Sequence, residues 1–75
     1  MKQYLIMKVI KHNNTTRINY HSKCSVSESL ERSWDYAFTD YNECENKMCE
    51  LEHYDKPYLE KGFKFEYIIF EREAN

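Results

Sequence analysis

Two segments with period-two patterning flank Asn13-Asn14, and they restrict the fold of this 75-residue chain more than any other feature. Asparagine tolerates positive φ, so the pair predicts a two-residue hairpin loop between strands over residues 3–11 and 16–22. A shift of the pairing by one residue would place apolar side chains opposite polar ones, so the pattern specifies the register. The predicted pairs are Val9–Ile18 and Met7–Tyr20 on one face, and Ile10–Arg17, Lys8–Asn19 and Ile6–His21 on the other.

A third strand is predicted over residues 63–72, where aromatic and β-branched residues recur with a period of two. Between the hairpin and this strand, Ser25 and Glu28 form a capping box that predicts a helix over residues 26–53. Pro57 and Gly62 predict that a loop over residues 53–62 follows it. The apolar positions of the predicted helix recur every three or four residues and are Leu30, Trp34, Ala37, Tyr41, Cys44, Met48 and Leu51.

The helix has an alternative interpretation. Residues 40–45 could end one helix and cap a second, because Asn is a favourable N-cap residue with Glu three positions later. We favour one long or kinked helix. The element order is then β-β-α-β in a single α+β domain over residues 1–75, with a three-stranded antiparallel sheet in the order 2-1-3 and the helix on one face.

One helix covers one face of such a sheet, so the other face is expected to stay uncovered. Contiguous exposed apolar residues usually mark an interface. We therefore expect this face to bind a partner or a second copy of the chain, as a homodimer. The alternative is that the helix or the C-terminal tail folds over it. The residues expected on this face are Tyr4, Ile6, Ile10, Ile68 and Phe70.

The formal net charge of −2 hides an uneven distribution. Residues 1–23 carry a charge of +5, residues 24–60 carry −7, and residues 61–75 are neutral. Either the two charged segments attract each other, or the acidic helix binds a protein with a basic surface, such as a nucleic-acid-handling enzyme. The residues proposed for the acidic partner-binding surface are Glu28, Glu31, Asp35, Glu45, Glu52, Tyr36 and Tyr54.

No residue pattern predicts catalysis, a metal site or a cofactor. Cys44, Cys49 and His53 resemble a ligand set, but Cys44 and Cys49 lie about 140° apart on a helix. Glu50-x-x-His53 matches part of a di-iron motif, which needs carboxylates from several helices. One glycine excludes the Gly-rich nucleotide-binding motifs. The odd number of cysteines predicts reduced thiols in a cytoplasm, and no apolar run is long enough to span a membrane.

Nucleic-acid binding is the alternative function, and it would use the basic hairpin. Phosphate contacts need clustered cations, and only part of this set shares a face of the predicted hairpin. The cations are Lys2, Lys8, Lys11, Arg17 and Lys23, and the candidate stacking residues are Tyr4, Tyr20 and His21.

The segment Asp40-Tyr-Asn-Glu-Cys-Glu-Asn-Lys47, the small size and the β-β-α-β order resemble the small accessory proteins that phages and other mobile elements encode against host machinery. The order of elements is also similar to that of a phage antitoxin family. The resemblance implies a non-catalytic inhibitor that acts in the host cytoplasm. It would bind one host protein, such as a CRISPR effector, a toxin, a nuclease or RNA polymerase.

Overall fold

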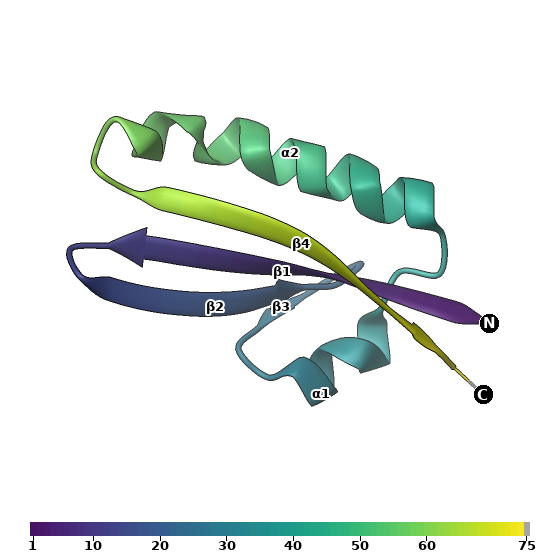
Figure 1. The fold of residues 1–75 in the computed structure, drawn as a ribbon. Coiled ribbons are helices and arrows are strands. Elements are labelled where there is room, and N and C mark those ends of the chain that lie inside the picture. Colours follow the sequence, from purple (N-terminus) through teal and green to yellow (C-terminus); the bar gives the residue numbers. More distant parts are fainter. Residues whose placement is uncertain (75) are drawn as a thin grey trace.

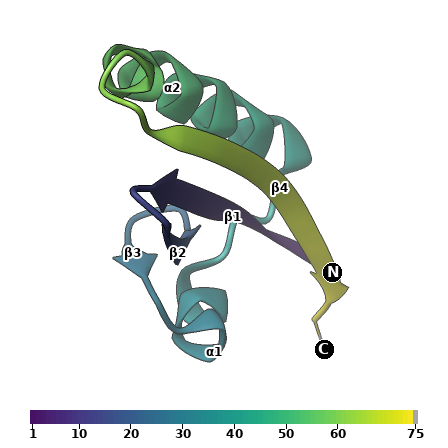
Figure 2. The same cartoon turned by 60° about the vertical axis from the view of Figure 1, so that its left-hand side comes forward.

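The computed structural model describes residues 1–74, which form an α+β fold with an antiparallel sheet (Figure 1). Two helical layers lie on opposite faces of this sheet, as Figure 2 shows. One layer is the long helix α2 (Tyr41–Leu59), and the other is formed by α1 (Leu30–Ser33) and the 3-10 helix η1 (Trp34–Tyr36). The elements are β1 (Lys2–His12), β2 (Thr15–His21), β3 (Val26–Ser27), α1 (Leu30–Ser33), η1 (Trp34–Tyr36), α2 (Tyr41–Leu59) and β4 (Lys64–Glu73).

The predicted hairpin is confirmed. Asn13 and Asn14 have φ angles of 49° and 64°, so both asparagines adopt the left-handed conformation that a two-residue hairpin loop requires. The Thr15 hydroxyl donates to the His12 carbonyl at 2.5 Å and closes the turn. All five predicted pairs are present in the β1–β2 ladder: Val9–Ile18, Met7–Tyr20, Ile10–Arg17, Lys8–Asn19 and Ile6–His21.

The prediction of one helix over residues 26–53 is wrong. The chain breaks at Phe38, which is buried and exchanges two backbone hydrogen bonds with Tyr4 of β1, at 2.8 and 3.0 Å. Asp40 then caps α2, because its carboxylate accepts a hydrogen bond from the Asn42 N–H at 2.9 Å. The break lets the polypeptide pass from one face of the sheet to the other. The alternative with two helices is therefore closer to the observed structure, although the N-cap of α2 is Asp40 and not Asn42.

The predicted loop over residues 53–62 is also wrong, because α2 continues to Leu59 and includes Pro57. Proline removes an N–H donor and crowds the carbonyl four residues earlier, and the helix ends two residues after Pro57. The turn into β4 is made at Gly62, with a φ of 91°. The predicted capping box at Ser25 is absent as well, since Ser29 caps α1 by accepting from the Arg32 N–H.

The sheet has four strands in the order β3-β2-β1-β4. The predicted three-stranded sheet in the order 2-1-3 is therefore wrong. It omitted β3, a two-residue strand that pairs Val26 with His21 and Ser27 with Tyr20. The expected antiparallel pairing of the first strand with the last is present. β4 pairs with β1 from Lys2, opposite Glu73, to Lys11, opposite Lys64.

The predicted uncovered face combines residues from both faces of the sheet. In the β1–β4 ladder Ile6 pairs with Ile69, so even-numbered β1 residues share the α2 face with odd-numbered β4 residues. Ile6 is fully buried there in a core with Phe38 and Cys44. Tyr4 and Ile10 also belong to the α2 face. Ile68 and Phe70 belong to the opposite face, which α1 and η1 cover in part (Figure 2).

Candidate protein-binding groove

The seven residues predicted as one acidic surface lie in two places. Three of them are on α2, and four lie in the segment that leads through α1 and η1 on the opposite face of the sheet (Figure 1). The break at Phe38 separates the two groups. Glu45, Glu52 and Tyr54 form the first group, and Glu28, Glu31, Asp35 and Tyr36 form the second.

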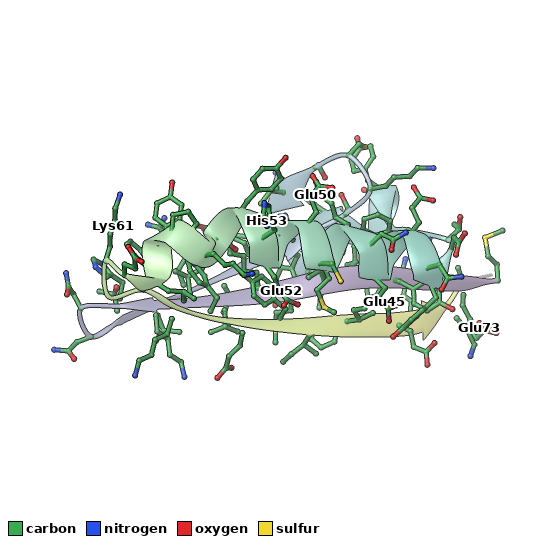
Figure 3. The ribbon with its side chains drawn as sticks, turned by 90° about the horizontal axis from the view of Figure 1, so that it is seen from above. Glu45, Glu50, Glu52, His53, Lys61 and Glu73 are labelled. Carbon is green, nitrogen blue, oxygen red and sulfur yellow. The ribbon has the colours of Figure 1, made fainter. Side chains whose placement is uncertain are left out.

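The two flanks of α2 differ in how their carboxylates are paired. On the flank toward β2, Glu43 lies 3.8 Å from Lys23, and Glu50 lies 3.4 Å from Lys47. On the flank toward β4, Glu45 and Glu52 have no cation within 4 Å among residues 1–74. Figure 3 shows this separation, with Glu45 and Glu52 on the β4 side of the helix. The β4 flank is therefore the one with free negative charge.

A hollow of about 170 Å³ lies between this flank and β4. Its floor is aromatic, since Phe65 and Tyr67 point from β4 toward the helix. Leu59 is 52% exposed at one end of the hollow, and Glu52 lies at the other end of the part of α2 that lines it. We call this hollow, with Glu45 farther along the same flank, the α2–β4 groove. The residues that line the hollow itself are Glu52, Asp55, Lys56, Leu59, Phe65 and Tyr67.

A buried polar cluster supports the groove. Lys8 Nζ lies 2.7 Å from Asp55 Oδ2, and the Tyr67 hydroxyl donates to the same oxygen at 2.5 Å. The side chains of Lys8 and Asp55 are only 11% and 13% exposed, and the Lys8 ammonium lies 4.9 Å from the centre of the Phe65 ring. Burial, and then the hydrogen bond to Asp55, raise the pKa of Tyr67. The cluster thus anchors α2 to β1 and β4, and it fixes the aromatic floor.

This cluster was not predicted from the sequence, although one signal was present. Asp55 continues the apolar stripe of Cys44, Met48 and Leu51 with the same spacing. A carboxylate on such a stripe is expected to need a buried cation. Lys8, on an otherwise apolar row of the first strand, supplies it.

Most of the basic hairpin residues are paired in the fold. Lys2 lies 3.6 Å from Glu71, Lys11 lies 3.8 Å from Glu66, and Lys8 and Lys23 bind Asp55 and Glu43 as described above. Arg17 remains exposed on β2. The attraction between the basic and acidic segments that the sequence suggested therefore accounts for two of the five hairpin cations, Lys8 and Lys23, whereas Lys2 and Lys11 pair with carboxylates of β4.

The cysteine and histidine residues of the possible metal motif do not converge. Cys44 is buried in the core, and burial raises the pKa of its thiol to about 11. Cys49 and His53 lie on exposed positions of α2 (Figure 3 labels His53). Residues 1–74 contain no group of three or more His, Cys, Asp and Glu side chains that could hold a metal. All three cysteines in this part of the chain are free thiols.

None of the helices in residues 1–74 combines the length and the hydropathy that crossing a membrane requires. No protein-family model, curated protein or solved structure matches the chain. The α2–β4 groove is therefore the feature from which a function can be argued.

Proposed function

We propose that this chain is a non-enzymatic protein-binding module that occludes a basic surface of one partner protein. The observation that carries the proposal is the α2–β4 groove, where an aromatic floor lies beside Glu52, and Glu45 lies farther along the same flank; neither carboxylate has a cation within 4 Å among residues 1–74. Apolar contacts supply affinity at an interface, and free carboxylates select a basic partner. Carboxylates already held in ion pairs, such as Glu43 and Glu50, contribute less to this selection.

The resemblance to phage accessory proteins suggests the class of partner. Those host defence effectors, toxins and other enzymes that handle nucleic acids expose Lys and Arg to bind phosphate groups. An acidic module can occupy the same side chains and block them without any chemistry of its own. We therefore propose a phage-type inhibitor that acts in the host cell.

Charge reversal on the two flanks of α2 tests the proposal. Glu45→Lys with Glu52→Lys reverses the free charges of the groove, whereas Glu43→Lys with Glu50→Lys makes the same change of net charge on the paired flank. Each variant is used to co-purify proteins from the natural host. The partner should be lost with the first pair and retained with the second. Equal retention of the partner by both double variants would show that the α2–β4 groove is not the binding site.

Nucleic-acid binding is a second candidate, favoured by the end of the molecule that carries the hairpin turn. There the His12 ring stacks on Phe63 with centroids 3.8 Å apart and planes within 3°. A hollow of about 450 Å³ lies next to this pair and is also lined by Ile10 and Arg17. Stacked aromatic rings beside cations suit single-stranded nucleic acid. Two of the nearest cations, Lys8 and Lys11, are held by carboxylates, which makes this candidate the weaker one.

Self-association is proposed through a smaller patch than the sequence suggested. On the sheet face away from α2, Ile18 and Ile68 are 40% and 42% exposed; Met7 of β1 pairs with Ile68 and lies diagonally across from Ile18, which pairs with Val9. These three residues come from β2, β1 and β4 and lie on the same face of the sheet. A second copy of the chain could cover this patch.

A further inference from the structure

Within residues 1–74, β4 is an edge strand, so one side of its backbone faces no other strand. The Ala74 N–H donates to the Met1 carbonyl at 2.7 Å, and the Met1 amino group donates to the Ala74 carbonyl at 3.4 Å. Hydrogen-bonded and non-hydrogen-bonded pairs alternate along an antiparallel ladder, so even-numbered residues of β4 bond to β1. The residues that turn their N–H and C=O groups outward are Phe65, Tyr67, Ile69, Glu71 and Glu73.

The same odd-numbered residues point their side chains toward α2. A strand added to this edge would lie about 4.8 Å from β4, and it would send every second side chain into the α2–β4 groove. Glu45 and Glu52 lie above this path, about 10 Å apart along the helix. Strand residues two and four positions apart are separated by about 7 and 14 Å. The flexible side chains of Lys or Arg at alternate positions would therefore reach both carboxylates.

The end of the groove at Leu59 favours a different kind of side chain on the added strand. Leu59 and Phe65 are apolar, and Lys56 stands beside them, so a cation is unfavourable there. On the opposite face of the sheet, an added strand would pack against Ile68 and Phe70. These surroundings favour apolar residues at the positions between the cations.

A second copy of this chain does not fit the edge. The residues that its own β4 would direct toward α2 include no cation: they are Phe65, Tyr67, Ile69, Glu71 and Glu73. Such a dimer would cover Glu45 and Glu52 without neutralising them, and buried unpaired charge is costly. The chemistry of the edge therefore favours a different protein.

We propose that the partner binds as an added β-strand on β4, through an extended segment in which Lys or Arg alternates with apolar residues and the cations face α2. This inference rests on the proposed protein-binding function and names the form of the partner. Backbone hydrogen bonds to the outward groups of β4 would supply affinity, and the carboxylates of α2 would supply selectivity.

Amide hydrogen exchange by NMR tests the added strand directly. The probe is a blocked nine-residue peptide in which Arg alternates with Val, and the control peptide has Glu in place of Arg. With the Arg peptide at ten times its dissociation constant, exchange at the outward amides should slow about tenfold. The amides to follow are those of Phe65, Tyr67, Ile69 and Glu71. Those of Glu66, Ile68 and Phe70, already bonded to β1, and those of β3 should change little.

Each outcome distinguishes the inference from the proposed function. Loss of peptide binding in the Glu45→Lys/Glu52→Lys variant, with retention in Glu43→Lys/Glu50→Lys, would support both. Binding of the Arg peptide without slower exchange in β4 would overturn strand addition and leave the acidic flank as a binding surface. Failure of the Arg peptide to bind, or equal binding of the Glu peptide, would also overturn strand addition, whereas the co-purification experiment decides the proposed function separately. A dimer with slow β4 exchange in the absence of peptide would overturn the choice of partner.

Discussion

Asp55 is the residue at which the polar contacts between α2 and the sheet converge. Its replacement by Ala would leave Lys8 charged and nearly buried, and the Tyr67 hydroxyl without an acceptor. Removing one partner of a buried ion pair costs about 3–5 kcal/mol, so Asp55→Ala should lower the free energy of unfolding in urea by about that amount. The double variant Lys8→Met/Asp55→Leu leaves no buried charge and should lose much less. Equal losses for the two variants would contradict this account.

His21 predicts a pH dependence of stability. It is 8% exposed, and its Nε2 has no hydrogen-bond partner among residues 1–74. Burial lowers the pKa of His21 below its ordinary value of 6.5; Lys8 and Lys47 lower it further, while Asp55 opposes them. The unfolded chain therefore binds a proton first as the pH falls.

Above about pH 6.5 the free energy of unfolding should have its full value. It should decrease as the pH falls from there through the folded pKa of His21. Urea unfolding at closely spaced values between pH 7.5 and 5 measures it. His21→Phe should flatten this slope, whereas His53→Gln, at an exposed position on α2, should keep it. An unchanged slope in His21→Phe would rule out His21 as the group responsible.

The same substitution, Ile→Lys, is expected to destabilise the fold strongly on one face of the sheet and only slightly on the other. Ile6→Lys places a charge in the core beside Phe38 and Cys44 and should cost more than about 4 kcal/mol, enough to abolish the circular dichroism of the fold. Ile68→Lys, at a 42% exposed position, should change stability by less than about 1 kcal/mol. A folded Ile6→Lys variant would contradict the face assignment.

The same variant measures self-association. By light scattering, the wild-type chain of 9.2 kDa should have the mass of a dimer, and Ile68→Lys that of one chain. A wild type that already has the mass of one chain would remove the proposal that Ile18, Met7 and Ile68 form a dimer patch.

The hairpin and the break in the helix show what the sequence could and could not predict. Asn13-Asn14 fixes the β1–β2 register locally, because a two-residue loop allows one pairing. The sequence does not determine which residues of β1 and β4 share a face of the sheet. About fifty residues separate these strands, and either face of each could point to the helix. The extended conformation of Phe38 could not be predicted from the sequence either. The helical stripe of apolar residues passes through its neighbour Ala37, and only the backbone contact with Tyr4 makes residue 38 extended. Glu45 and Glu52 were proposed as site residues from the sequence. Leu59, Phe65 and Tyr67 could be assigned to the site only from the fold, because they come together through the packing of α2 on β4.

At the scale of the whole molecule, the charge is separated along the longest dimension, which is 42 Å. The half that carries the hairpin turn, residues 8–19 and 55–67, has six cations and three acids, a net charge of +3. The remaining residues have five cations and ten acids, a net charge of −5. This polarity orients an approaching partner, because a basic protein is drawn to one end and a nucleic acid to the other.

Salt dependence distinguishes the two ends. Four cations of the positive half, Arg17, Lys56, Lys61 and Lys64, are free of ion pairs among residues 1–74. Four phosphate contacts give a slope of about −3 for the logarithm of single-strand affinity against that of salt, or about a 50-fold loss between 50 and 200 mM. Fluorescence anisotropy with a labelled oligonucleotide measures this slope.

Arg17→Glu with Lys61→Glu should abolish oligonucleotide binding and leave capture of the protein partner unchanged, because neither residue lines the α2–β4 groove. Glu45→Lys with Glu52→Lys should have the reverse effect. No measurable oligonucleotide binding at 50 mM salt would eliminate the nucleic-acid candidate. The positive end would then serve to repel basic surfaces and turn the acidic half of α2 toward them, a role that a slower association rate in the Arg17→Glu/Lys61→Glu variant would reveal.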